Sequence, residues 1–228
     1  DHLPELTHPL LQLLCPNVLR PLPSVTMMQF QLIDHALSET QVLPKGTPVF
    51  SRPVKGVSCE FRTCADLAIA PLEIRNITTL RSAEAPVVRI DLGALSEQPL
   101  GRMKCDHLRF HLAGGSHNAL TLYQWLSQHL DKLYLHINQY RFTLPPTVSF
   151  VGFEKEESLL PSAGEHLDGY RILQEFLWFP ERFYGFCIEG LSAYWPDEAA
   201  AHIQLELRFN APLTPDLLID QTTILLNC

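Results

Sequence analysis

The sequence has little charge, and its positive charges are not clustered. Only 18% of the 228 residues are charged, and the 17 Lys and Arg against 25 Asp and Glu give a formal net charge of −8. A typical domain is about one quarter charged, so we expect much buried surface, including surface that partners bury. Nucleic-acid sites need clustered cations. The sequence therefore predicts no nucleic-acid partner.

Long hydrophobic runs are also missing. One long run without charge, residues 112–130, contains two glycines and eight polar or histidine residues, which makes it too polar to cross a bilayer. No basic stretch followed by an apolar one opens the chain. We expect a soluble protein without direct membrane insertion. Because the first methionine is Met27, we also expect a processed chain or an excised piece of a longer protein.

Motifs that carry chemistry are scarce. The sequence has no glycine-rich nucleotide loop, no Gly-x-Ser-x-Gly elbow, no Cys-x-x-Cys and no His-Glu-x-x-His. The nearest metal candidate is Cys105 with His107 and His111, which share one face of an expected strand. Arg109 lies on the same face and its charge discourages a cation. We predict no metal and no cofactor.

Two carboxylates leave an enzymatic alternative open. Glu175 and Glu181 flank an aromatic cluster, and such surroundings raise a carboxyl pKa, as a general acid requires. In the competing interpretation, Glu175 forms an exposed ion pair with Arg171 worth roughly 0.2–0.5 kcal/mol, and Glu181 is a turn residue. We favour the second interpretation and predict no catalytic residue. A carbohydrate- or peptide-binding β module is a third hypothesis, suggested by the strands and exposed aromatic residues.

Cysteines are few and scattered. Most occupy apolar, strand-like contexts, where free cysteine is a common small core residue. We expect reduced thiols in a reducing compartment. The six are Cys15, Cys59, Cys64, Cys105, Cys187 and Cys228.

Runs of alternating residues are the main structural signal. They predict strands within 27–33, 58–74, 86–95, 106–114, 133–137, 147–153, 183–191, 199–209 and 222–228. Helical spacing predicts helices over 3–15, from Ser116 as N-cap through Leu133, and over 169–179 with Asp168 as cap. Strands in runs with inserted helices indicate an α+β, β-rich fold of mostly antiparallel sheets with two or three inserted helices. We expect a helix and Pro-rich connector (1–26), a β subdomain (27–82) and an α+β subdomain (83–228).

One short stretch is unusually aromatic. Residues 169–191, GYRILQEFLWFPERFYGFCIEGL, hold seven of the 21 aromatic residues. Pro180 stops the expected helix, so we predict a helix–turn–strand core nucleus in which Phe179 and Phe183 are buried. Trp178, like Trp125 on the preceding helix, lies off the main apolar stripe, and both are candidate interface residues.

This stretch closely resembles the signature of the TssF family, also called VasA or ImpG. Two further stretches, 3–30 and 46–74, resemble the leucine-rich helix with its Pro-rich turn and the segment that follows in the family. The resemblance covers nearly the whole chain. The residues that match the core of the family motif are Tyr170, Phe176, Phe179, Pro180, Phe183 and Gly190.

The resemblance implies a structural role and no catalysis. Members of the family are baseplate subunits of the bacterial type VI secretion system, a contractile machine similar to a phage tail. The implied partners are TssG, TssK, TssE and a second TssF copy, in a wedge around the spike hub. The implied location is the cytoplasm, in a baseplate docked on an inner-membrane complex.

Overall fold

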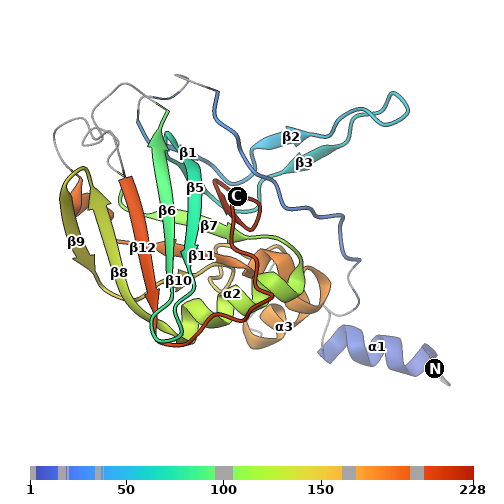
Figure 1. Cartoon of the computed structure of the whole chain (residues 1–228). Coiled ribbons are helices and arrows are strands. Elements are labelled where there is room, and N and C mark those ends of the chain that lie inside the picture. Colours follow the sequence, from blue (N-terminus) through green and yellow to red (C-terminus); the bar gives the residue numbers. More distant parts are fainter. Residues whose placement is uncertain are drawn as a thin grey trace.

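Two antiparallel sheets with helices packed against them form the body of the chain (Figure 1). The computed structural model describes residues 4–14, 19, 21–33, 37, 39–95, 105–160, 168–195 and 203–228. One continuous core of buried apolar side chains joins the two sheets. The expected α+β, β-rich, mostly antiparallel fold is confirmed.

The larger sheet has five strands in the order β5-β6-β12-β8-β9, all antiparallel. Their bounds are Leu72–Leu80 for β5, Val87–Ala94 for β6, Ile203–Phe209 for β12, Leu130–Ile137 for β8 and Tyr140–Leu144 for β9. Strand β12 alternates as the sequence predicts: Ile203, Leu205 and Leu207 enter the core. Since β5 pairs with β6, this sheet contains strands from both sides of residue 82, the expected boundary between the β subdomain and the α+β subdomain.

The smaller sheet has the order β10-β11-β7-β13. Its strands are β10 (Ser149–Phe150), β11 (Gly185–Ile188), β7 (Leu108–Leu112) and β13 (Ile224–Leu226). Phe110 and Phe186 face each other across β7 and β11, and their rings stack with centroids 5.1 Å apart. Both are fully buried, so this pair lies at the centre of the core.

Helix α2 (Ser116–Gln128) joins β7 to β8 and buries Ala119, Leu122 and Leu126. Two expectations about it are wrong. Gly115, not Ser116, is the N-cap, and the helix ends at Gln128 rather than continuing to Leu133. Leucines at helical spacing continue beyond residue 128, but pairing with β12 and β9 draws residues 130–137 into the sheet. Tertiary pairing here overrides local periodicity.

The N-terminal part is built from short elements. Helix α1 (Pro4–Leu14) precedes β1 (Gln41–Leu43), β2 (Pro48–Phe50), β3 (Glu60–Arg62) and β4 (Leu67–Ile69). Strand β1 pairs with β4, and β2 pairs with β3 in a hairpin that projects from the body (Figure 1). The 58–74 stretch is not one continuous strand, because β3 ends before Ala65 and Asp66 and β4 begins after them.

The expected strand at 27–33 is wrong. This segment is extended and lies beside β13, but it makes no ladder. The Phe30 amide donates to the Asn227 carbonyl at 2.9 Å, and the Gln29 side chain donates to the Leu226 carbonyl at 3.1 Å. Asn227 has φ 62°, a left-handed conformation that turns the backbone away from a strand. A cavity of about 390 Å³ separates the segment from β5.

Candidate partner-binding surface

The aromatic signature folds into three consecutive elements. Helix α3 (Asp168–Trp178) is followed by the 3-10 turn η3 (Pro180–Phe183) and then by β11. The Phe179 amide still bonds to the Glu175 carbonyl at 2.7 Å, whereas Pro180 has no amide hydrogen and begins η3. The predicted stop at Pro180 is confirmed. After β11, Gly190 has φ 72° and begins the 3-10 turn η4 (Leu191–Tyr194).

A buried carboxylate holds α3 in place. Glu175 is 0% exposed, and its Oε1 accepts hydrogen bonds from the Leu159 amide at 3.0 Å and the Leu160 amide at 3.3 Å. Its Oε2 accepts from Arg171, one turn earlier, at 3.3 Å and from the buried Arg182 of η3. Two cations and two backbone amides together compensate the free-energy cost of burying this charged carboxylate.

The same network fixes the loop 151–160. Arg182 donates through Nη2 to the Gly152 carbonyl at 3.2 Å and to the Glu157 carbonyl at 2.5 Å. The Glu157 carboxylate accepts from Arg109 of β7 at 3.1 Å and from the Gly152 amide at 2.5 Å. Helix, turn, loop and strand are thus joined by ionic contacts, which hold the outer surface of α3 in a fixed position.

The expectation of an exposed Glu175 is therefore wrong, although its pair with Arg171 forms. The orientation of α3 explains this. Its polar residue Glu175 faces the Arg182 network, while its apolar residues Tyr170, Leu173 and Leu177 are 71%, 54% and 75% exposed. Residues three and four positions apart share one helix face. These three side chains, with the exposed Phe176, form what we call the α3 stripe.

The motif residues thus separate into three groups by exposure. Phe183 is buried as predicted, and its ring contacts those of Phe153 and Phe176 at centroid distances of 5.3 and 5.8 Å. Phe179 and Pro180 are half-buried. Tyr170, Phe176 and Gly190 are exposed. The expected core nucleus is therefore formed by η3 and β11, whereas α3 turns most of its apolar residues outward.

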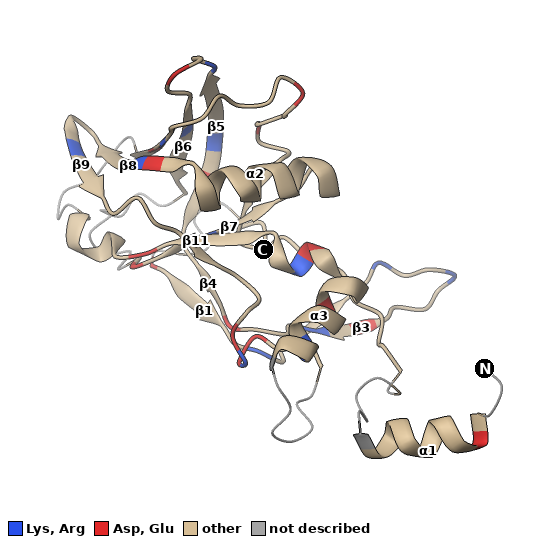
Figure 2. Cartoon of the chain, turned by 90° about the horizontal axis from the view of Figure 1, so that it is seen from below, with Lys and Arg blue, Asp and Glu red and all other residues tan. Residues whose placement is uncertain are grey.

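A second apolar stripe lies on α1. Leu6, Leu10 and Leu13 follow one another at intervals of four and three residues, and all three are exposed. Figures 1 and 2 both show α1 outside the body of the chain. Exposed apolar patches of this kind mark interaction sites. Sequence periodicity locates both stripes, but it gives no sign that they are uncovered.

The two tryptophans proposed for an interface are both half-buried. Trp125 packs against the core, and its ring centroid lies 5.2 Å from that of His129. The buried indole nitrogen of Trp125 has no hydrogen-bond partner among the described residues. Trp178 ends α3. Their proposed interface role stays a prediction.

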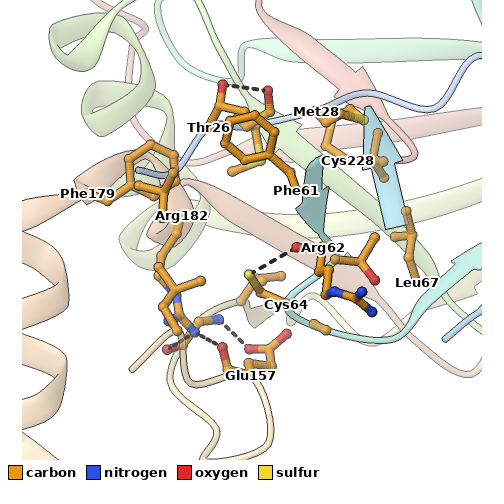
Figure 3. Close-up of a pocket in the computed structure, with 18 of the residues that line it drawn as sticks. Thr26, Met28, Phe61, Arg62, Cys64, Leu67, Glu157, Phe179, Arg182 and Cys228 are labelled. Atoms are coloured by element: carbon orange, nitrogen blue, oxygen red, sulfur yellow. Dashed lines mark hydrogen bonds between the residues drawn. The ribbon is translucent and has the colours of Figure 1, made fainter. Parts of the chain in front are cut away.

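A cavity of about 190 Å³ lies between the N-terminal segment 24–30, the residues around β3 and the loop 151–159 (Figure 3). Its charged groups already have structural partners. Arg182 and Glu157 belong to the network described above, Arg62 donates to Glu60 at 2.6 Å, and Asp66 accepts from the Lys45 amide at 2.6 Å. Apolar side chains such as Phe61 complete the wall. The cavity therefore has no set of free polar groups converging on one point, as catalysis requires.

The candidate metal ligands do not converge. Burial raises the pKa of the Cys105 thiol to about 11, and this thiol donates to the His107 carbonyl at 3.1 Å. His111 is buried, and burial together with the charge of Arg109 lowers its pKa to about 4, against a smaller opposite effect of Glu181. Among the residues the structure describes, no three His, Cys, Asp or Glu side chains are grouped to hold a metal ion.

Five of the six cysteines lie in the described part of the chain. These five are free thiols, and burial raises the pKa values of Cys187 and Cys228 to about 11. Cys15 lies outside the described residues. None of the helices in the described ranges combines the length and the apolar character needed to cross a membrane.

Comparison with known proteins places this chain in the class of type VI secretion system components. The sequence model of the family described as "Type VI secretion system, TssF" matches residues 1–228. The chain belongs to the TssF family.

Two relatives are informative. The chain is 27% identical over 209 residues to the type VI secretion system component TssF1 of Pseudomonas aeruginosa, covering 83% of this chain and 34% of that protein. It also matches a chain in the cryo-electron-microscopy structure of the TssK-TssF-TssG baseplate subcomplex, with TM-score 0.87 and 26% identity over 99% of this chain and 44% of the other. The chain thus spans less than half the length of either relative.

Proposed function

We propose that this chain is a structural part of the type VI secretion baseplate, acting by protein–protein contact. Family membership and the likeness to a chain of the TssK-TssF-TssG subcomplex support this proposal. The cavity at Arg182, whose charged groups are already paired, favours a scaffold over an enzyme.

The observation that carries the proposal is the α3 stripe. A helix normally turns its apolar side to the core, yet α3 turns Glu175 inward and leaves Leu173 and Leu177 exposed. The Glu175–Arg182 network holds this orientation without help from those leucines. An apolar surface on a rigid base is suited to a helix or groove of another subunit.

We assign the α3 stripe to TssG or TssK, the two other proteins named in the related subcomplex. The α1 stripe supplies a second apolar contact within the same assembly. On the family resemblance we further propose contacts with TssE and a second TssF copy around the spike hub. The same resemblance supports a cytoplasmic baseplate that docks on the inner-membrane complex.

The test is co-purification of the full-length protein with TssG and TssK from the same organism. The double variant Leu173→Ser with Leu177→Ser removes the exposed stripe. Each leucine buried in an interface contributes roughly 1.5–3 kcal/mol, so we expect binding to at least one partner to weaken by about tenfold or more. Melting should remain close to that of the parent, because both side chains are exposed.

The matched control is Leu120→Ser with Leu218→Ser, two exposed leucines away from α3. This variant should assemble like the parent. If the α3 variant co-purifies as well as the control does, the stripe is not the contact surface. If the parent itself binds neither TssG nor TssK, the proposed baseplate role is wrong.

A further inference from the structure

The outer face of the five-stranded sheet carries a cluster of arginines around one carboxylate. Glu206 of β12 is 2% exposed, and its cross-strand neighbours are Arg89 on β6 and Tyr134 on β8. Arg208 lies two residues further along the same face of β12. Arg141 lies on β9, the adjacent edge strand. We call these five residues the Glu206 cluster.

The cluster has more positive than negative charge. Arg208 Nε donates to Glu206 Oε1 at 2.7 Å and Arg89 Nε donates to Oε2 at 3.0 Å. Arg141 Nη2 lies 3.9 Å from Oε1, and His136 Nε2 lies 3.6 Å from Oε2. Burial raises the pKa of Glu206, but the hydrogen bonds and charges of Arg208 and Arg89 outweigh it and hold the pKa below its usual value. One carboxylate thus faces three permanent cations.

The arginines present their outer edges to solvent. Arg89 and Arg208 both bind Glu206 through Nε, and no described group accepts a hydrogen bond from their terminal Nη atoms. Their side chains are 36% and 37% exposed, and that of Arg141 is 45% exposed. The Arg141 guanidinium lies 3.6 Å from the Tyr134 ring centroid, which holds it against the sheet. Guanidinium edges held in this way are suited to bidentate carboxylate binding.

The rest of this face adds little negative charge. Arg75 pairs with Glu73 at 3.5 Å, the Asp91 carboxylate accepts from Gln204 at 2.6 Å, and Lys132 is exposed beside Arg208. Together with the exposed Asp131 beside Lys132, the described residues of the face hold five cations and four carboxylates, although the chain as a whole has a net charge of −8. A long polyanion such as nucleic acid would extend beyond this face and be repelled by the net negative charge of the chain. A short acidic segment would contact only the face itself.

We propose that the Glu206 cluster binds an acidic segment of another protein, with carboxylates of Asp or Glu engaging the outer edges of Arg89, Arg141 and Arg208. Glu206 acts as a positioning residue, because it fixes the Nε sides of Arg89 and Arg208 and leaves their Nη sides free. The surface lies on a different element from the α3 stripe and does not depend on the baseplate role.

The experiment measures fluorescence anisotropy of labelled hexaglutamate with the purified protein at low and at physiological salt. The parent should bind saturably and more weakly as salt rises. Arg141→Gln should reduce affinity about fivefold or more, and adding Arg89→Gln should reduce it further. Arg141→Lys keeps the charge but loses the planar guanidinium, so its affinity for hexaglutamate should lie between those of the parent and Arg141→Gln.

The control is Arg52→Gln, which removes an exposed cation in the loop of the β2–β3 hairpin and should bind like the parent. Arg141→Gln leaves both hydrogen bonds from arginine Nε to Glu206 in place, so its melting midpoint should match the parent even if the Arg89 variant does not fold. The proposal is overturned if the parent does not bind hexaglutamate saturably. It is also overturned if Arg52→Gln weakens binding as much as Arg141→Gln, or if hexathymidylate binds as tightly as hexaglutamate.

Discussion

Helices α2 and α3 both carry apolar residues at helical spacing, yet they pack in opposite orientations. Helix α2 turns Ala119, Leu122 and Leu126 into the core. Helix α3 turns Glu175 inward and exposes Leu173 and Leu177. The difference shows that periodicity locates the apolar face of a helix but does not say which molecule covers it. For α2 the cover is the chain's own core, and for α3 we propose another subunit.

The cause of the difference lies outside the helices. The structure on which α3 packs contains the buried Arg182 and the amides of residues 159 and 160, which need an anionic acceptor. Leaving such groups without a partner costs more than exposing leucines. In contrast, α2 packs on apolar residues of the sheets. Each helix therefore presents the face that its immediate neighbours require.

The largest expected effect tests the Glu175–Arg182 network on which α3 packs. Glu175→Ala leaves Arg182 buried without its carboxylate, and removing one partner of a buried pair costs about 3–5 kcal/mol. Urea unfolding of the variant should show this loss in the free energy of unfolding. Glu181→Ala, in the adjacent turn, is the control and should change stability by less than about 0.5 kcal/mol. Equal stability of the Glu175 variant and the parent would show that the network does not hold α3.

Sequence reasoning succeeds where one residue pattern has one structural outcome. The alternation in 203–209 predicts a strand with one apolar and one polar face, and the apolar residues of β12 do lie in the core. Sequence reasoning does not predict that Glu175 is buried, because Arg182 and the amides of residues 159 and 160 contact its carboxylate only in the folded chain. An acidic residue between Arg171 and Arg182 in an aromatic stretch is the one local sign. The alternation at 27–33 is misleading, because this segment makes only single bonds to Leu226 and to the turn at Asn227 and forms no ladder with β13 among the described residues.

The second effect tests the apolar packing of α2. Leu122→Ala removes a side chain that is 2% exposed, and core leucine truncations cost about 2–5 kcal/mol. The loss should appear as a lower urea midpoint with an unchanged denaturant slope. If Leu122→Ala melted like the parent, α2 would not be packed on the core in the manner described, and its contrast with α3 would disappear.

A smaller effect is expected on acidification. His111 of β7 has its pKa lowered to about 4 by burial and by Arg109, with Glu181 opposing. The unfolded chain therefore binds a proton that the folded chain does not, so stability is full above about pH 6.5 and falls as pH drops toward 4. The total loss is on the order of 3 kcal/mol.

Thermal or urea unfolding between pH 7 and 5 measures this slope before most carboxylates titrate. His111→Gln should flatten the slope in that window, whatever its stability at pH 7. A parent whose stability is constant from pH 7 to 5 would contradict the buried, neutral histidine.

The smallest expected effect is the most direct test of the comparison. Leu177→Ala removes a side chain that is 75% exposed, so the free energy of unfolding should change by less than about 0.5 kcal/mol. The same truncation at Leu122 is the counterpart on α2. A measured loss of about 2 kcal/mol or more at Leu177 would mean that the chain itself covers the α3 stripe in solution. In that event the stripe could not serve another subunit without first being uncovered. A loss within the expected limit leaves the stripe free, so the weaker co-purification expected of the serine variants would report contact with a partner rather than damage to the fold.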